Sequence, residues 1–231
     1  MISHQTRSRR HEVKLVGGRR SLESIYVWLM RNRLGFFQHH PDRYVNSVYF
    51  DTFNFQLYND HINNLPQRHK VRFRWPHQRT LPDTGDLEMK HKENRLGWKD
   101  IRSLEVPPNV ARNWREFTAC LFDDYPDFFP ASDCEAISPV LQTRFYRQYL
   151  VSADGYLRVT IDTELEIFDQ LGHTSQNFDD RLDLRDQCII ELKFAAKNHD
   201  HLNPFLTALP ARPVRCSKYV TGVQKLFLLS D

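Results

Sequence analysis

The amino-acid sequence predicts an α+β fold in which a closed antiparallel β-barrel is flanked by helices. Seven segments of the chain alternate apolar and polar residues with a period of two, which is typical of half-buried strands. A few segments show helical spacing with an apolar stripe, and the apolar faces of the strands are where such stripes can pack. A sheet that curls closed leaves no exposed edges and turns its polar faces inward, so the sequence predicts a barrel with a polar interior.

The segment KVRFRW at residues 70–75 shows the strand pattern most clearly, with Lys70, Arg72 and Arg74 on one face. A solvent-exposed face would explain one such strand. The same pattern of spaced cations recurs on other predicted strands, however, and cations exceed acids near the strand centres. The strand-centre cations are Lys14, Arg72, Arg74, Lys90, Lys92, Arg147, Arg158 and Lys193, and the acids are Glu12, Glu88, Asp162 and Glu191.

Turn and cap signals delimit the elements in chain order. Gly17 and Gly18 predict a turn after the first strand, and Ser21 is a candidate N-cap for the first helix. The loop at 76–86 is rich in Pro, Asp and Gly, so the strands on either side should form a hairpin. The predicted strands are 11–16, 46–52, 70–75, 87–92, 143–152, 156–167 and 188–194, with a short connector at 58–62, and the predicted helices are 22–32, 109–122 and 215–227.

Length and composition favour one domain with a substantial core. The chain has 231 residues, of which 40% are hydrophobic, and no segment has the composition of a linker. We therefore expect residues 1–231 to form a single domain. The 32 Lys and Arg residues nearly balance 29 Asp and Glu residues, so a cationic surface must arise from segregation of charge rather than from excess.

Cysteine usage and hydropathy indicate the compartment. The four cysteines are scattered singly, without a paired motif, which is typical of a reducing environment. The basic N-terminus is not followed by an apolar stretch, and no segment approaches the roughly 20 apolar residues of a membrane-spanning helix. We expect a cytoplasmic protein without a membrane segment of its own. A membrane-protein partner and the oligomeric state stay open.

Cations concentrated in a confined interior require an anionic partner, and phosphate oxygens suit them best. Arginine forms bidentate contacts with phosphate and lysine acts as a point charge, so a tunnel lined by both favours a chain of phosphoryl groups. Glu191, together with Glu12, Glu88 or Asp162, could hold Mg²⁺ or Mn²⁺ against such a chain. This combination is what phosphoryl transfer needs. The sequence contains no GxxxxGK[ST] phosphate-binding loop.

Eight segments together resemble the polyphosphate polymerase domain of the vacuolar transporter chaperone (VTC) family, within the triphosphate tunnel metalloenzymes. They are HEVKL, SVYFD, KVRFRW, LEMKHKENRLGWK, TRFYRQYL, LRVTIDTELEI, IIELKF and RCSKYVTGV. The similarity extends over about residues 10–226. It implies an antiparallel tunnel flanked by helices and a metal-binding role for Glu191. It also implies phosphate-binding, catalytic roles for Lys14, Arg72, Arg74, Lys90, Lys99, Arg147, Arg158, Arg215 and Lys218.

Three further residues complete the expected substrate site. Lys92 and Lys193 are candidate substrate contacts on the same strand faces, and Tyr49 is a candidate platform for a purine ring. Arg215 stands where a lysine is usual in fungal members, so the positive charge is kept with a different geometry.

The activity that the resemblance implies is transfer of the γ-phosphate of ATP onto a growing inorganic polyphosphate chain, with Mn²⁺ or Mg²⁺. Fungal members also carry an inositol-phosphate-sensing domain and membrane helices, which this sequence lacks, so a stand-alone catalytic domain is expected. A tripolyphosphatase or nucleoside triphosphate hydrolase of the same fold stays open, as does a non-catalytic polyphosphate-binding module. A nucleic-acid platform is disfavoured, because Glu12 and Glu191 would repel a phosphate backbone.

Overall fold

The strands form one antiparallel sheet in the computed structural model, which describes residues 10–93, 96–107, 113–124 and 137–228. Within these ranges the strand order is β1-β9-β7-β6-β2-β3-β4-β5, and β8 pairs with β7 outside this path. The strands are β1 (Arg10–Gly18), β2 (Phe37–Thr52), β3 (Gln67–Pro76), β4 (Thr84–Glu93), β5 (Leu96–Glu105), β6 (Ile137–Val151), β7 (Leu157–Asp169), β8 (Arg181–Leu184) and β9 (Gln187–Ala195). The predicted antiparallel sheet is confirmed.

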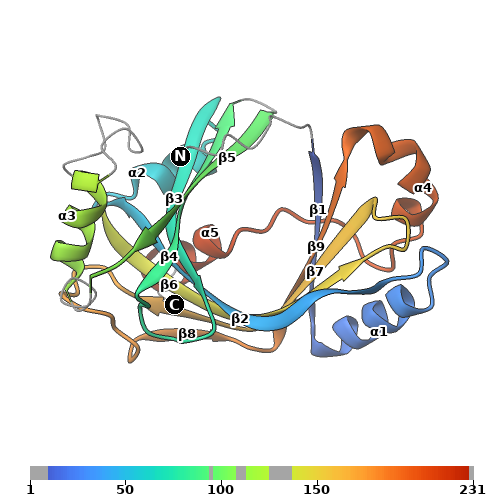
Figure 1. Ribbon diagram of the computed structural model, residues 1–231, viewed down its shortest axis with the longest axis horizontal. Coiled ribbons are helices and arrows are strands. Elements are labelled where there is room, and N and C mark those ends of the chain that lie inside the picture. The colour runs from blue at the N-terminus through green and yellow to red at the C-terminus, as the bar shows by residue number, and fades with distance from the viewer. Residues whose placement is uncertain (1–9, 94–95, 108–112, 125–136, 229–231) are drawn as a thin grey trace.

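The sheet curls so that β3, β4 and β5 face β1 across an opening (Figure 1). The predicted closed barrel is not confirmed, because β1 and β5 end the strand order and no hydrogen-bonded pairing joins them in the described ranges. Alternation of residue types determines which face of a strand turns inward, but it does not determine which edges pair. An ion pair does cross from β1 to the strand next to β5, with Lys90 Nζ on β4 lying 3.7 Å from Glu12 Oε2 on β1.

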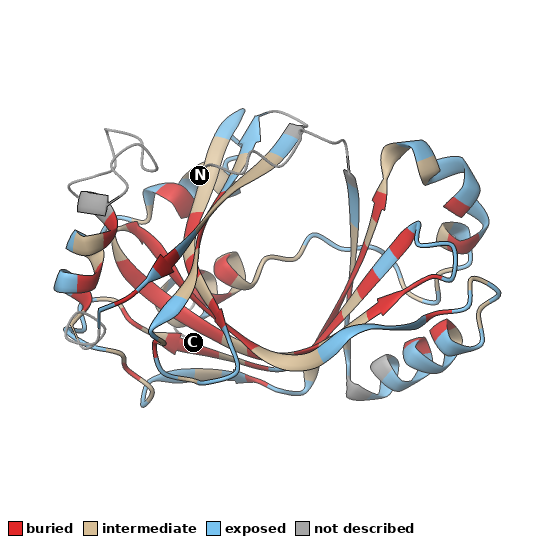
Figure 2. Cartoon of the chain, viewed as in Figure 1, coloured by how far each residue is buried: buried red, intermediate tan, exposed pale blue. Residues whose placement is uncertain are grey.

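Helices cover the apolar faces of the strands, as the sequence predicts. They are α1 (Arg19–Met30), α2 (Gln56–Ile62), α3 (Trp114–Asp124), α4 (His199–Thr207) and α5 (Lys218–Val223), followed by a π-helical turn, η4 (Gln224–Leu228). Ile25 and Leu29 of α1 share a buried cluster with Leu202 and Phe205 of α4 and with apolar residues of β1, β7 and β9. At the other end of the sheet, Phe117 of α3 joins the cluster formed by β3 and β4. Figure 2 shows the buried positions concentrated along the strands.

Some local predictions differ from the structure. The predicted turn at Gly17 and Gly18 and the Ser21 cap are wrong, because β1 pairs with β9 as far as Gly18 and α1 follows directly. The expected connector at 58–62 is α2, and β5, β8 and α4 were not expected. Only part of the helix predicted at 109–122 can be compared, since 109–112 lie outside the described residues. Among the described helices, none combines the length and apolarity required to cross a membrane.

Candidate active site

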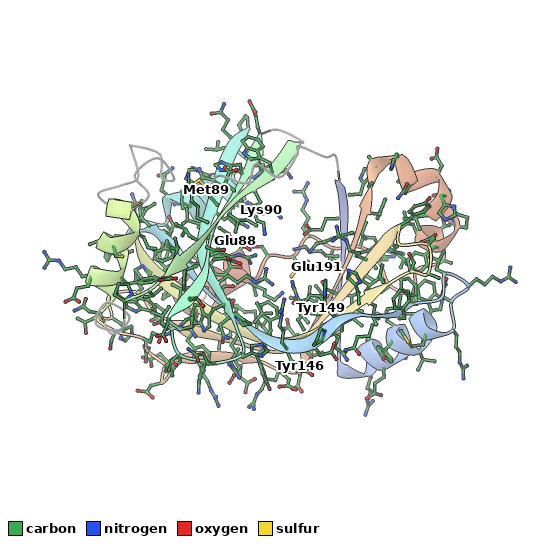
Figure 3. All side chains as sticks on the ribbon, viewed as in Figure 1. Glu88, Met89, Lys90, Tyr146, Tyr149 and Glu191 are labelled. Atoms are coloured by element: carbon green, nitrogen blue, oxygen red, sulfur yellow. The ribbon has the colours of Figure 1, made fainter. Side chains whose placement is uncertain are left out.

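The inner face of the curled sheet carries its charges in clusters, each organised by a carboxylate. We call the first the Glu191 cluster, formed by Glu12 and Lys14 of β1 with Glu191 and Lys193 of β9. The register sets Lys14 opposite Glu191 and Glu12 opposite Lys193. Lys14 Nζ lies 3.0 Å from Glu12 Oε1 and 3.0 Å from Glu191 Oε1, and Lys193 Nζ donates to Glu191 Oε2 at 2.5 Å. Figure 3 shows Glu191 across the opening from Glu88 and Lys90.

The charges of this cluster support one another. Burial acts to raise the pKa of Glu191, but Lys193 and Lys14 hold it well below its ordinary value. Burial likewise acts to lower the pKa of Lys14, and the carboxylates of Glu191 and Glu12 raise it above its ordinary value. Both residues therefore stay charged at neutral pH.

The second cluster, the Glu88 cluster, joins β3, β4 and β5 around a carboxylate that is only 3% exposed. Arg72 donates to Glu88 Oε2 from Nε at 2.7 Å and from Nη2 at 2.5 Å. Lys99 Nζ donates to Glu88 Oε1 at 2.9 Å, and Arg74 Nη1 lies 3.5 Å from the same oxygen. Burial lowers the pKa of Arg74, and Arg72 and Arg147 lower it further. Burial also lowers the pKa of Lys99, whereas Glu88 helps to raise that of Arg72, so Arg74 and Lys99 are less well compensated than Arg72.

The third cluster, the Asp162 cluster, lies between β6, β7 and α5. Arg147 binds Asp162 through two hydrogen bonds, from Nε at 2.6 Å and from Nη2 at 2.7 Å. Lys218 Nζ donates to Asp162 Oδ2 and lies 4.2 Å from the centroid of the Phe145 ring. The two cations share one buried carboxylate, so positive charge remains available to a phosphate group.

Lys70 forms a separate cationic position between β3 and the start of α5. Its Nζ donates to Ser217 Oγ at 2.8 Å and lies 3.2 Å from His61 Nε2. Burial lowers the pKa of Lys70 well below its ordinary value, and Lys90 and Lys14 lower it further. Burial and Lys70 lower the pKa of His61 to about 3, so this imidazole is neutral and can accept a hydrogen bond.

The remaining predicted cations lie at the ends of strands or before α5. Lys90 and Lys92 are exposed near the end of β4, and Arg215 is exposed before α5. Arg158 is exposed on β7, opposite Lys193 of β9 in the register. The structure therefore places these side chains around the three clusters rather than within them.

Tyr49 lies at the site, but its ring is covered and does not form the open platform that was expected. Its ring is 7% exposed and stacks on Tyr219, with ring centroids 5.2 Å apart. Its hydroxyl accepts a hydrogen bond from Arg72 Nη1 at 3.2 Å. This placement suits a partner of Arg72 and leaves little of the ring open to a purine.

Comparison with known proteins assigns the chain to a family. The model of the VTC domain family matches residues 9–227. This chain belongs to the VTC domain family. The resemblance drawn from the eight sequence segments is therefore confirmed, and membership supports a function related to polyphosphate or triphosphate. No curated protein matches the sequence.

Solved structures share the fold of this VTC domain at low sequence identity. A protein from Hippeastrum, described as a candidate adenylyl cyclase with a dominant triphosphatase activity, is 16% identical, with a TM-score of 0.55 and coverage of 94% of this chain and 96% of that one. A candidate adenylate cyclase from Bacillus halodurans is 12% identical, with a TM-score of 0.56 and coverage of 95% and 98%. At these identities the likeness shows the shared fold alone and does not show the reaction.

A buried aspartate that sequence reasoning missed positions α5 in this VTC domain. Asp51, at the end of β2, accepts hydrogen bonds from the backbone N–H groups of Leu57 at 2.8 Å and Tyr58 at 3.0 Å, and from the Tyr219 hydroxyl. It thereby joins β2, α2 and α5, and so sets the place of Lys218. The capping pattern does not reveal it, because Asp51 lies five residues before α2 begins and Phe55 holds the N-cap position. The link of Asp51 to Tyr219 carries no sequence signal.

The carboxylates can be tested as ligands of a divalent cation. Glu12 and Glu191 both contact Lys14, so their oxygens converge on one point. In the described part of the chain, no group of three or more His, Cys, Asp or Glu residues could hold a metal. Two carboxylates still fit Mg²⁺ or Mn²⁺, which commonly take one or two protein carboxylates and complete their shell with water and phosphate oxygens. Glu88 fits less well, since its oxygens already face three cations.

Proposed function

We propose that this VTC domain is a metal-dependent polyphosphate polymerase, which transfers the γ-phosphate of ATP to the end of an inorganic polyphosphate chain. The observation that carries the proposal is the excess of cations over acids on the inner face. The cations are Lys14, Lys70, Arg72, Arg74, Lys90, Lys99, Arg147, Lys193 and Lys218, and the acids are Glu12, Glu88, Asp162 and Glu191. Such a surface needs a polyanion, and a phosphate chain fits the curl of the sheet.

The arginines are placed to hold phosphoryl groups in fixed orientations. Arg72 and Arg147 are each anchored by a carboxylate, so their guanidinium groups are ordered before a ligand arrives. Arg74, whose charge is disfavoured by burial and by Arg72 and Arg147, would be stabilised by a phosphate. The terminal oxygen of the phosphate chain is itself the nucleophile, so the protein has only to align it with the γ-phosphate and neutralise the charge.

We propose Glu12 and Glu191 as the residues that hold Mn²⁺ or Mg²⁺. A divalent cation supplies charge neutralisation for phosphate oxygens during transfer. Lys14, which lies between the two carboxylates, keeps them in place and ionised in the absence of the ion. The arrangement favours a counter-ion role for Glu88, because Arg72, Arg74 and Lys99 surround it.

A triphosphatase is the second candidate, and the Hippeastrum neighbour, whose description includes a dominant triphosphatase activity, favours it. The same cations would serve either reaction, since the two differ in whether water or a phosphate chain accepts the phosphoryl group. A non-catalytic phosphate-binding module is less well supported. Binding alone does not need two neighbouring carboxylates, Glu12 and Glu191, that fit a divalent cation.

The whole chain, residues 1–231, is proposed to act as one catalytic unit on ATP and polyphosphate, without nucleic acid. The test is to incubate the purified protein with ATP and Mn²⁺ or Mg²⁺, with and without a short polyphosphate primer. ADP, free phosphate and long-chain polyphosphate are measured together, with Arg74→Ala as the inactive control. ADP matched by polymer is the expected result. Free phosphate without polymer would establish the triphosphatase instead, and tight polyphosphate binding without turnover would establish a binding module.

A further inference from the structure

A pocket of about 230 Å³ lies at the end of the inner face, where β7 and β9 approach the start of α4. Tyr156, Arg158, Lys193 and Asn198 are among the residues that line it. The pocket thus combines an aromatic ring, two cations and a side-chain amide. None of these residues except Lys193 belongs to the three clusters described above.

Neighbouring side chains hold the Tyr156 ring in place while leaving it open to solvent. The residue is 48% exposed, and its ring makes an edge contact with His201, with ring centroids 5.5 Å apart and planes at 86°. His201 Nε2 lies 3.0 Å from Asp154 Oδ2, and Asp154 Oδ1 accepts a hydrogen bond from the Tyr156 backbone N–H at 2.9 Å. A single exposed tyrosine is ordinary on a protein surface. A supported ring at the wall of a cationic pocket is a platform for a flat ligand.

The cations of the pocket connect it to the proposed site of phosphoryl transfer. Arg158 and Lys193 are opposite one another on β7 and β9, so both extend from the same face of the sheet. Lys193 donates to Glu191, and Glu191 contacts Lys14, so the charges continue from the pocket into the Glu191 cluster. The backbone positions of Lys193 and Glu191 are about 7 Å apart on β9, and their side chains meet. Phosphoryl groups that contact Lys193 are therefore directed along β9 toward Lys14.

We propose that this pocket binds the nucleobase of a nucleoside triphosphate, with the base stacked on Tyr156 and its phosphates directed along Lys193 toward Glu191. Stacking on an aromatic ring accepts any base, because every base has a π face. Asn198 offers both a donor and an acceptor for the polar edge of the base. The inference rests on the proposed function, since it names where the nucleoside part of that substrate binds. Tyr49, whose ring is covered by Tyr219, cannot serve in this way.

A comparison of ATP with inorganic tripolyphosphate distinguishes the contribution of the base to binding from that of the phosphates. We would titrate the full-length protein by calorimetry with ATP and with inorganic tripolyphosphate, at one salt and Mg²⁺ concentration. The variants are Tyr156→Ala, Tyr156→Leu, which keeps bulk without an aromatic face, and Tyr156→Phe, which keeps the ring. Tyr26→Ala is the matched control, because Tyr26 is a half-exposed tyrosine on α1 that does not line the pocket.

We expect Tyr156→Ala and Tyr156→Leu to weaken ATP binding tenfold or more, while tripolyphosphate binding changes less than twofold. Tyr156→Phe and Tyr26→Ala should bind both ligands as the unmodified protein does. Unchanged ATP affinity in either the alanine or the leucine variant would overturn the inference, as would an equal loss for both ligands. If the unmodified protein binds tripolyphosphate and ATP shows no dependence on Tyr156, the proposed function stands and the base pocket does not. If it binds neither ligand, the proposed function itself is overturned.

Discussion

Replacement of Glu88 by glutamine tests whether this carboxylate organises the cations of β3, β4 and β5. The substitution keeps the shape of the side chain and removes its charge, so Arg72, Arg74 and Lys99 lose their common counter-ion. Removing one member of a buried ion pair costs about 3–5 kcal/mol, because the remaining charge is left uncompensated. Glu88 is 3% exposed, so solvent screens little of this loss. For a domain of this size, the loss corresponds to a fall in Tm of roughly 6–20 °C.

The assay is thermal and urea unfolding of Glu88→Gln with and without inorganic tripolyphosphate. A bound phosphate chain replaces the missing negative charge, so saturating tripolyphosphate should raise the Tm of the variant more than that of the unmodified protein. Glu166→Gln is the matched control, because Glu166 pairs with Arg181 at 2.9 Å near the surface and its loss should cost only about 0–1 kcal/mol. The reasoning is refuted if Glu88→Gln is no less stable than the control. Unchanged stability with altered metal dependence would identify Glu88 as a metal ligand.

Three other changes test the remaining parts of the site. Arg74→Ala should lower turnover about 10²–10³-fold while the Tm without ligand stays the same or rises, because burial and the nearby Arg72 and Arg147 disfavour its charge and lower its pKa; a large fall in Tm would contradict this. Glu191→Gln should bind polyphosphate and lose the Mn²⁺ dependence of turnover, and full metal-dependent activity would mean that the ligand lies elsewhere. The pKa of Lys70 is lower in the folded than in the unfolded protein. At pH values between these two pKa values the unfolded chain binds more protons, so the free energy of unfolding rises with pH in that range. Urea unfolding at a series of pH values should show this rise, and Lys70→Met should flatten it; an unchanged slope would show that Lys70 is not its source.

Sequence alternation predicted the faces of the strands well. Lys14, Arg72, Arg147 and Glu191 all lie on the inner face, because a period of two leaves only one register that buries the apolar residues. The same rule could not say that β1 and β5 remain without backbone pairing to each other in the described ranges, nor that an ion pair between Lys90 of β4 and Glu12 of β1 crosses between the two ends of the sheet.

Contacts between distant segments were beyond the sequence. The hydrogen bond from Tyr219 to Asp51 joins residues 168 positions apart, and that from Lys70 to Ser217 spans 147. Neither pair has a local pattern, since each depends on where α5 packs. Close packing decides that place: a Cβ on Gly222 of α5 would lie 2.7 Å from Leu141 Cδ2 on β6. The two tyrosines also differ in a way that alternation does not reveal. The Tyr49 ring is covered by Tyr219, whereas Tyr156 remains exposed.

The sharing of carboxylates explains how a nearly neutral chain can present a cationic inner face. Cations buried without partners would destabilise the fold by several kcal/mol, so the inner face needs acids. Acids matched one to one with cations would leave no charge for a phosphate chain. In the structure Glu88 contacts Arg72, Arg74 and Lys99. Asp162 likewise contacts Arg147 and Lys218. Each of these two acids fixes the position of more than one cation but neutralises only one positive charge. The carboxylates therefore preorganise the phosphate site while leaving it a net positive charge, which is the condition that binding and transfer of phosphoryl groups both require.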